Sequence, residues 1–332
     1  MSTMINARYN NLIKGIGRIL ARGRHQAYAA VNSVLIRTYW EIGREIVEFE
    51  QKGAGRAVYG SDLLNQIAQD LRLHHGKGFS RSNVYIMRQL YLKYPKIQTL
   101  SGKLSWSHLV ELIGVKSDRA RGFYEKQCLL ESWSVRELNR QINSMLFERL
   151  ALSKNKKAVV QLSKSGHVIR KDEDIVKEPY VLEFLKIPQS RMYSERELEQ
   201  RIIDNIQMFL LEMGKGFTFV GRQYRLSFRN KHYYVDLVFY HRILKCFVLV
   251  DLKIGSADHL DVGQMNMYLN YFKKEEMAAD DKEPIGIILA ADKDDVLVEY
   301  ALGGVSSKLF VSRYQLYLPD KEQIQAELRK VI

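Results

Sequence analysis

Apolar residues in the first part of the chain recur at the spacing of amphipathic helices. Residues 27–51 give the clearest pattern, and their apolar positions share one helical face: Val31, Val34, Leu35, Tyr39, Ile42, Ile46 and Phe49. A second helix is expected over about 61–74, followed by a glycine-containing link at 76–79. Ser80 is then placed to cap a third helix, which carries Val84, Met87, Leu90 and Tyr91.

A capping-box pattern extends this helical part. Ser134 and Glu137 are spaced as the reciprocal partners of such a box, which predicts a helix that begins there and runs to about residue 150. The whole chain has only five prolines, and few prolines suit long helices. We therefore expect an all-α domain over residues 1–150.

The pattern changes after residue 150. Residues 151–171 carry six lysines and arginines and no acidic residue, with apolar positions between them. We interpret 151–178 as a basic linker with a short strand, and two roles stay open for it: a solvated tether, or a strap that contacts phosphates. From residue 179 to 332 the patterns alternate: a helix over 195–213, strands near 217–228, 232–240 and 245–253, a helix near 261–274, a strand at 285–290, a helix near 296–302 and a strand near 309–312. This order predicts an α/β sandwich as the second domain.

Composition narrows the class of protein. The chain has 332 residues, of which 46% are hydrophobic, so two domains with real cores are feasible. No apolar run approaches the roughly 20 residues needed to span a bilayer, and the first residues lack the apolar core of a signal peptide. Cys128 and Cys246 lie far apart among apolar residues, which suits inert thiols in a reducing cytoplasm. The net charge of +13 favours a polyanionic partner, nucleic acid before membrane.

Two aspartates interrupt the runs of β-branched and aromatic residues that predict buried strands. Asp236 lies in the run 233–240, and Asp251 lies in the run 247–253. A buried carboxylate is costly unless its charge is compensated. Side chains two positions apart on a strand share a face, so Asp251 and Lys253 point the same way and Leu252 points into the core. Such a group can hold a divalent cation and activate a water; the alternative is a buried Asp–Lys ion pair without a metal.

The helix predicted after Ser194 offers three glutamates, and periodicity separates them. Glu199 lies on or beside the apolar stripe of this helix, where a carboxylate has no structural explanation. Glu197 is on the polar side at the reciprocal capping-box position, and Glu195 lies in the first turn, which favours a carboxylate. We therefore take Glu199 as the functional one.

A helix after the strands adds two more candidates. Gln264 and Tyr268 are four residues apart and share a helix face. Read alone, Gln264 is a surface amide, but beside an Asp-x-Lys motif it becomes a candidate for contact with a phosphate or a water. For Tyr268, stacking on a base or sugar and a place in the core are both open.

Together these residues resemble the signature of the PD-(D/E)XK nuclease superfamily, with Glu199, Asp236, Asp251-Leu252-Lys253 and Gln264-x-x-x-Tyr268 at the matching places. The Gln-x-x-x-Tyr element resembles the RecB-like branch. The segments 104–109, 210–217 and 220–224 are similar to the bacterial YhcG-like family, a resemblance that covers nearly the whole chain. Two positions depart from the superfamily pattern: Val235 replaces the nominal proline before the first aspartate, and Asp251 replaces the usual glutamate.

The resemblance implies a restriction-endonuclease-like domain with a central mixed sheet flanked by helices. It implies Mg²⁺ as the cofactor, with Mn²⁺ as a substitute, because hard oxygen ligands suit these ions. Asp236 and Asp251 would be direct ligands, the Leu252 carbonyl a further one, and Glu199 a ligand directly or through water. Lys253 would orient or deprotonate the attacking water, and Gln264 would position the scissile phosphate or Lys253.

The sequence therefore predicts a cytoplasmic, metal-dependent DNA nuclease. The alternatives are a DNA-binding or complex-forming scaffold with an inactive nuclease fold, and a nuclease that processes RNA. The link before Ser80 is similar to a helix-turn-helix that presents Arg81 and Arg88 to DNA, although ordinary helix pairs have such links too. A homodimer would supply two active sites for the two strands of a duplex, and the helical domain could instead dock a protein partner.

Overall fold

The structure is a computed structural model that describes residues 2–51, 62–96, 103–152, 156–188, 192–302 and 308–331. It divides into two compact units, residues 1–121 and 122–332. Within the described ranges, no helix combines the length and the hydropathy needed to cross a lipid bilayer.

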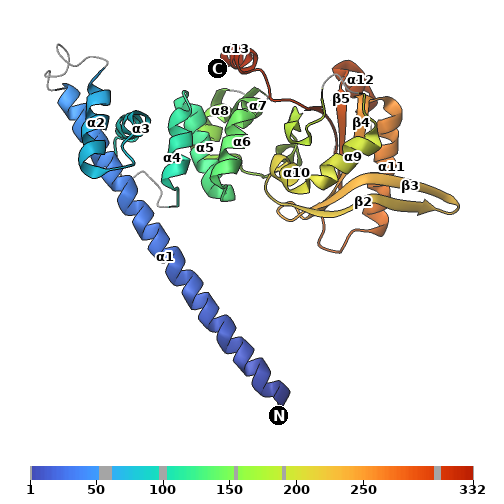
Figure 1. Cartoon of the computed structure of the whole chain (residues 1–332). Helices are drawn as coiled ribbons and strands as arrows, with labels where there is room; N and C mark the ends of the chain where they lie inside the picture. The colour runs from blue at the N-terminus through green and yellow to red at the C-terminus, as the bar shows by residue number, and fades with distance from the viewer. Residues whose placement is uncertain are drawn as a thin grey trace. The chain divides into compact units, whose positions relative to one another are not determined.

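The first unit is helical, as the periodicity predicts (Figure 1). It contains α1 (Ser2–Gln51), α2 (Leu63–His75), α3 (Arg81–Lys93) and α4 (Trp106–Gly114). The start expected for the second helix near residue 61 lies outside the described residues. Ser80 caps α3, since its hydroxyl accepts the backbone N–H of Asn83 at 3.2 Å. The cap sets the start of α3 so that Val84, Met87 and Leu90 are all buried.

Helices α1 and α3 pack closely in this unit. Gly43 of α1 allows the approach, because a Cβ at this position would lie 2.0 Å from the carbonyl oxygen of Met87. The indole N–H of Trp40 donates to the carbonyl of Tyr94 at 2.7 Å, which fixes the chain just after α3. Helix α1 is much longer than the predicted 27–51, and residues between Tyr9 and Val34 leave large apolar side chains exposed on it.

The second unit begins with helices and continues into a sheet. Its helices before the sheet are α5 (Asp118–Glu131, which starts in the first unit), α6 (Val135–Asn143), α7 (Leu146–Leu152) and α8 (Lys156–Ser165). Ser134 and Glu137 form the predicted capping box, but the helix breaks at Ser144, so α6 and α7 replace one helix to residue 150. The strand expected in the basic segment is wrong: Lys156–Ser165 is helical, and it buries Val159 and Leu162, which lie three residues apart.

The later elements build a six-stranded mixed sheet in the order β1-β6-β5-β4-β3-β2. The strands are β1 (Tyr180–Val181), β2 (Phe217–Phe228), β3 (Lys231–His241), β4 (Cys246–Ser256), β5 (Ile285–Asp292) and β6 (Leu309–Gln315). The helices are α9 (Glu195–Asp204), α10 (Ile206–Met213), α11 (His259–Glu275), α12 (Asp295–Leu302) and α13 (Lys321–Val331). Strands β2, β3 and β4 pair antiparallel, and β4, β5, β6 and β1 pair parallel.

Two hydrophobic cores cover the two faces of this sheet. Val248, Val250 and Leu252 pack with α9 and α10, whereas Leu249 packs with α11 on the other face. Alternate residues of one strand thus enter different cores, as the strand period requires. The chain is therefore an N-terminal helical region followed by an α/β domain whose mixed sheet is flanked by helices (Figure 1).

A buried charge network joins α6 and α7 to the sheet domain. The carboxylate of Glu212 on α10 has no exposed surface and accepts hydrogen bonds from Arg149 at 2.8 Å and Arg140 at 3.0 Å. Its oxygen also accepts the N–H of Val181 in β1 at 3.0 Å, and the Lys177 ammonium donates to its backbone carbonyl. Burial alone would raise the pKa of Glu212, but the surrounding cations lower it to about 2.

Candidate functional site

The β2–β3 ribbon changes face at one position, and this positions the first carboxylate. Arg222 pairs with Leu237, which packs toward α9, whereas Tyr224 pairs with Val235, which packs toward α11. Residues that are paired across two strands point to the same face of the sheet. Between these two pairs, both strands therefore reverse the face that their side chains enter. The residues between them are Gln223, whose φ is +47°, and Asp236. A left-handed backbone is uncommon for a glutamine and marks a local kink.

The second carboxylate lies on the next strand. The β3–β4 pairing runs from His241 and Cys246 to Leu237 and Val250. Asp236 and Asp251 are the next residues in this register. On the side of β3, the N–H of Leu252 donates to the side-chain Oδ2 of Asp236 at 2.8 Å. Asp251 is only 5% exposed, and burial followed by the charge of Asp236 raises the pKa of Asp251 to about 7. Burial likewise raises the pKa of Asp236.

Lys253 lies against Asp251, as the strand period predicts. Its Nζ is 3.0 Å from Oδ2 of Asp251 and 3.2 Å from Oδ1 of Asp261, which is in the first turn of α11. Burial of the ammonium opposes its charge, but the two carboxylates raise the pKa of Lys253 above its ordinary value. Asp261 is held by a capping box with Asp258, whose backbone N–H donates to it at 3.0 Å. The lysine is therefore a fixed cation.

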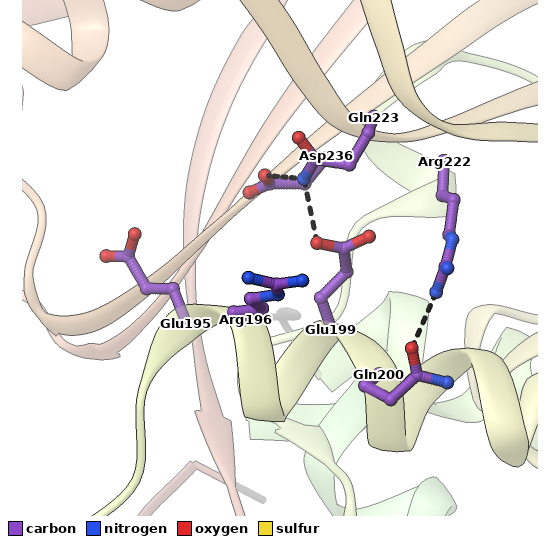
Figure 2. A pocket seen from close by; sticks show the side chains of 7 residues that line it. All are labelled: Glu195, Arg196, Glu199, Gln200, Arg222, Gln223 and Asp236. Atoms are coloured by element: carbon purple, nitrogen blue, oxygen red, sulfur yellow. Dashed lines mark hydrogen bonds between the residues drawn. The ribbon is translucent and has the colours of Figure 1, made fainter.

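Glu199 enters the site from α9 and is 7% exposed, on the buried side of the helix as predicted. The side-chain amide of Gln223 donates to Oε2 of Glu199 at 2.7 Å and to Oδ1 of Asp236 at 3.0 Å, as Figure 2 shows. Glu197 instead accepts from Arg201, four residues on, at 3.1 Å. Ser194 caps α9 through the N–H of Glu197.

Glu199, Gln223 and Asp236 line a cavity of about 590 Å³. Its walls are formed by Glu195, Arg196, Glu199, Gln200, Arg222, Gln223 and Asp236 (Figure 2). Arg222 donates to the Oε1 of Gln200 at 2.8 Å, and Arg196 lies on the same wall. The cavity thus combines carboxylates with two guanidinium groups, a mixture that suits a phosphate ester carried beside a cation.

Gln264 and Tyr268 lie at the edge of the group on α11. The amide of Gln264 donates to the hydroxyl of Tyr268, which donates to the carbonyl of Tyr234 at 3.0 Å. Tyr268 has no exposed surface, and its ring belongs to the core beside α11. The core position, not a base-stacking surface, is therefore what the structure gives for Tyr268, because a ring without exposed area cannot stack on a base.

The donor set fits a hard divalent cation. Asp236 and Asp251 supply carboxylate oxygens from adjacent strands, and the Leu252 carbonyl belongs to β4, which pairs with β5 at this point. Among the described residues, no three acidic, histidine or cysteine side chains already enclose a metal position. Mg²⁺ keeps several waters and uses one or two carboxylates plus substrate phosphates, so it does not need such an enclosure.

The candidate DNA contacts of the first unit differ from one another. Arg81 is exposed at the start of α3, where it lines a groove with Tyr85, Lys93 and Lys116. Arg88 instead forms an ion pair with Glu50 of α1, with Nε 2.9 Å from the carboxylate. The structure thus leaves Arg81 open to a ligand and ties Arg88 to the helical core.

Sequence reasoning missed several residues of the site, among them Gln223, Arg222 and Asp261. Gln223 carries no sequence signal for its left-handed backbone. Arg222 lies beside it in a strand where a cation predicts only a solvent-facing position. Asp261 could have been found, because Asp258 and Asp261 have the spacing of a capping box that starts a helix close to Lys253.

The fold and the acidic–lysine constellation define a nuclease of the PD-(D/E)XK, restriction-endonuclease-like class. Residues 173–329 match the family model of the YhcG PDDEXK nuclease domain, and residues 15–149 match the DUF1016 N-terminal domain. The chain is 38% identical over 360 residues to "Putative nuclease YhcG" of Escherichia coli (strain K12), an alignment that covers 99% of this chain and 96% of the relative. The chain therefore belongs to the YhcG family of nucleases.

Solved structures give more remote likenesses, and the chain spans about half the length of each. A repair endonuclease from Pyrococcus abyssi is 22% identical, with 40% of this chain and 50% of that chain covered and a TM-score of 0.28. A structure described as "Structure of EndoMS-dsDNA2 complex" is 18% identical, with 41% and 50% covered and a TM-score of 0.27.

Proposed function

We propose that this chain is a divalent-metal-dependent nuclease that hydrolyses phosphodiester bonds in DNA. The observation that carries the proposal is the meeting of Asp236 and Asp251 at the point where β3 and β4 separate, with the Lys253 ammonium 3.0 Å from Asp251. Two buried carboxylates beside a fixed cation are expensive to fold. A site that binds a metal and a phosphate accounts for all three groups.

Each residue has a role that its surroundings support. Asp236 and Asp251, with the Leu252 carbonyl, would hold Mg²⁺ or Mn²⁺, and Glu199 would hold the ion through water. Bound there, the ion would supply a Lewis acid and lower the pKa of a water. Lys253, fixed between Asp251 and Asp261, would donate a hydrogen bond to the attacking water and offset charge on the phosphate. Paired with two carboxylates, its ammonium is suited to orienting this water rather than deprotonating it.

Two further groups would position the substrate. Arg196 and Arg222 line the cavity beside Glu199 and are placed to contact phosphates that flank the scissile one. Gln264 lies on α11, the helix whose first turn carries Asp261, and its side chain is only partly buried. Gln264 would help to position Lys253. The net charge of +13 supports a polyanionic substrate.

The helical unit would help to hold the DNA through Arg81. Its exposed guanidinium should contact one phosphate, so Arg81→Gln should weaken DNA binding and lower the slope of log affinity against log salt by about one. Arg88→Gln is the matched control. It breaks the ion pair with Glu50, so it should lower the melting temperature and leave the salt slope unchanged.

The decisive experiment is cleavage by the full-length protein with Mg²⁺, with Mn²⁺ and with a chelator. Linear, circular, branched and single-stranded DNA and an RNA would be offered side by side. Wild type should cut DNA only with a metal, and Lys253→Ala should lose at least about a hundredfold in rate while still binding DNA. Asp204→Asn, at an exposed position of α9, is the control with unchanged rate.

Two results would redirect the assignment. If wild type binds DNA but cuts no substrate with either metal, the protein is a scaffold with an inactive nuclease fold. If it cuts RNA alone, the assignment of phosphodiester hydrolysis holds, but the assignment of DNA as the substrate is wrong.

A further inference from the structure

Gln223 lies between the two carboxylates that face the cavity. Its side-chain nitrogen has two N–H groups, and both are used, one by Glu199 at 2.7 Å and one by Asp236 at 3.0 Å. The opposite orientation of the amide would turn its oxygen toward two carboxylates, so the donor assignment is the only satisfied one. The partial positive charge of the amide NH₂ group thus lies between two carboxylates of this wall (Figure 2).

Both oxygens of Asp236 accept a hydrogen bond, one from Gln223 and one from the backbone of Leu252. Oδ2 of Asp236 accepts the backbone N–H of Leu252 at 2.8 Å. Oδ1 accepts the side-chain amide of Gln223 at 3.0 Å. A cation that is bound at Oδ1 of Asp236 and held by Glu199 through water would therefore compete with the Gln223 amide.

The backbone holds the amide in this place, but the side chain is free to leave it. Gln223 has a φ of +47° and follows an irregularity in the β2 pairing between Phe219 and Gly221. A conformation of this kind in a non-glycine residue persists only where the surroundings require it, and it gathers at functional sites. The side chain itself is exposed and borders the open cavity, so it can rotate away without disturbing the core.

We propose that Gln223 is a placeholder for the catalytic cation: its amide bridges Glu199 and Asp236 in the metal-free protein and is displaced when the metal binds. The inference rests on the proposed function, since it requires a metal at these carboxylates. It gives the chain a metal-free state in which neither carboxylate is left without a donor. A neutral amide is suited to this task, because a lysine or arginine there would bind too strongly to be exchanged for a metal.

The placeholder has a thermodynamic signature of its own. Metal entry must break two hydrogen bonds to charged acceptors, which are stronger than ordinary ones. A variant without the amide has no such bonds to break, so it should bind the metal more tightly. The same variant removes the donor shared by Oε2 of Glu199 and Oδ1 of Asp236, so it should be less stable without metal. A residue that merely positioned the ligands for the metal would show weaker binding when removed.

The test is titration calorimetry of DNA-free, full-length protein with Mn²⁺, together with melting temperatures in chelator and in Mn²⁺. Gln223→Met keeps the length of the side chain and removes both donors. We expect its Kd for Mn²⁺ to fall by about tenfold. Its melting temperature in chelator should fall by about 3–6 °C, with most of the loss recovered in Mn²⁺.

Two companions make the result specific. Gln223→Asn keeps an amide and suits a left-handed backbone, but it is one methylene too short to bridge both carboxylates, so it should also tighten Mn²⁺ binding. Gln200→Met removes an amide from the same cavity wall. The Nε2 of Gln200 donates to Asp204 and not to the two site carboxylates, so its removal should leave the Kd unchanged.

The results distinguish a failure of the placeholder role of Gln223 from a failure of the proposed function. If Gln223→Met and Gln223→Asn bind Mn²⁺ no more tightly than wild type, the placeholder is wrong even when wild type binds the metal and cuts DNA. If wild type binds no Mn²⁺, the proposed function falls first and the placeholder falls with it. Tighter binding by Gln200→Met as well would point to a general effect of the cavity wall and would also overturn the inference.

Discussion

Replacing Glu212 by glutamine should destabilise the protein strongly although the two side chains have the same size. The carboxylate is buried between Arg140, Arg149 and Lys177, and the substitution leaves these cations without their shared anion. The pKa of Glu212 falls from 4.5 to about 2 on folding, which corresponds to ~3 kcal/mol in favour of the charged form. Removing one partner of a buried ion pair costs about 3–5 kcal/mol in other proteins.

The lower end of that range is the better expectation, because one of the cations can lose its charge. Burial lowers the pKa of Lys177 to about 8 even though Glu212 attracts its proton, so without Glu212 the amine can become neutral near physiological pH. A loss of ~3 kcal/mol corresponds to a fall in melting temperature of about 6–12 °C for a unit of this size. Differential scanning calorimetry at pH 7 measures it, with Glu195→Gln, on an exposed residue, as the control.

The pH dependence gives this prediction a second, independent check. The folded pKa of Glu212 is depressed, so its stabilisation is complete above the unfolded value near 4.5 and is lost as pH falls toward 2. The gap between wild type and Glu212→Gln should therefore narrow as pH falls from about 5 toward 2. The reasoning is refuted if the variant melts within about 2 °C of wild type at pH 7, or if the gap stays the same at pH 3.

Three further predictions concern the site and the helical unit. In chelator, Asp251→Asn should melt higher than wild type at pH 8 and by a smaller margin at pH 5, because burial raises the folded pKa to about 7 and stability is lost as pH rises from the unfolded value near 3.8 through that range; it should also cut no DNA. Glu199→Gln should lose cleavage with little change in melting temperature, whereas Glu197→Gln should keep it, and the reverse result in the nuclease assay would place function on the other helix face. Gly43→Ala should cost about 1–3 kcal/mol in urea unfolding, because its Cβ would meet a backbone carbonyl of α3, while Gly17→Ala, with open space around it, should not destabilise.

Local signals predicted most elements of the fold. Ser80, Ser134 and Ser194 cap the helices that they were expected to cap, because a side-chain hydroxyl and an orphan N–H act over three residues of one chain. The strands around Asp236 and Asp251 were visible as apolar runs, since both of their faces enter a core.

The predictions that failed concern elements that depend on tertiary contacts. The helix expected over 195–213 breaks at Asn205, where α9 ends and α10 begins, and no strong breaker marks the place. Strand β1 has two residues, too few for a period, and it forms because Tyr180 and Val181 pair with the distant β6. A strand was expected near Val159, but Val159 and Leu162 lie three residues apart, which is a helical spacing.

The residues of the site also divide into those that local signals predict and those whose positions depend on neighbouring strands. Asp251 and Lys253 could be placed on one face from strand geometry alone, and Glu199 on the buried side of its helix from periodicity. Gln223 could not, because its position depends on a kink shared with the neighbouring strand. The metal-binding and catalytic roles remain predictions until the variants are measured.

The network around Glu212 also bears on how this protein can be recombined in evolution. Arg140 and Arg149 belong to helices α6 and α7, whereas their shared acceptor belongs to α10 of the sheet domain. A crossover between 152 and 172 that joined a foreign helical domain to this sheet domain would leave Glu212 buried without its arginines. We therefore expect these three positions to be inherited together, and successful exchanges of the helical region to fall before α6, in the stretch where the compact sheet-bearing unit begins.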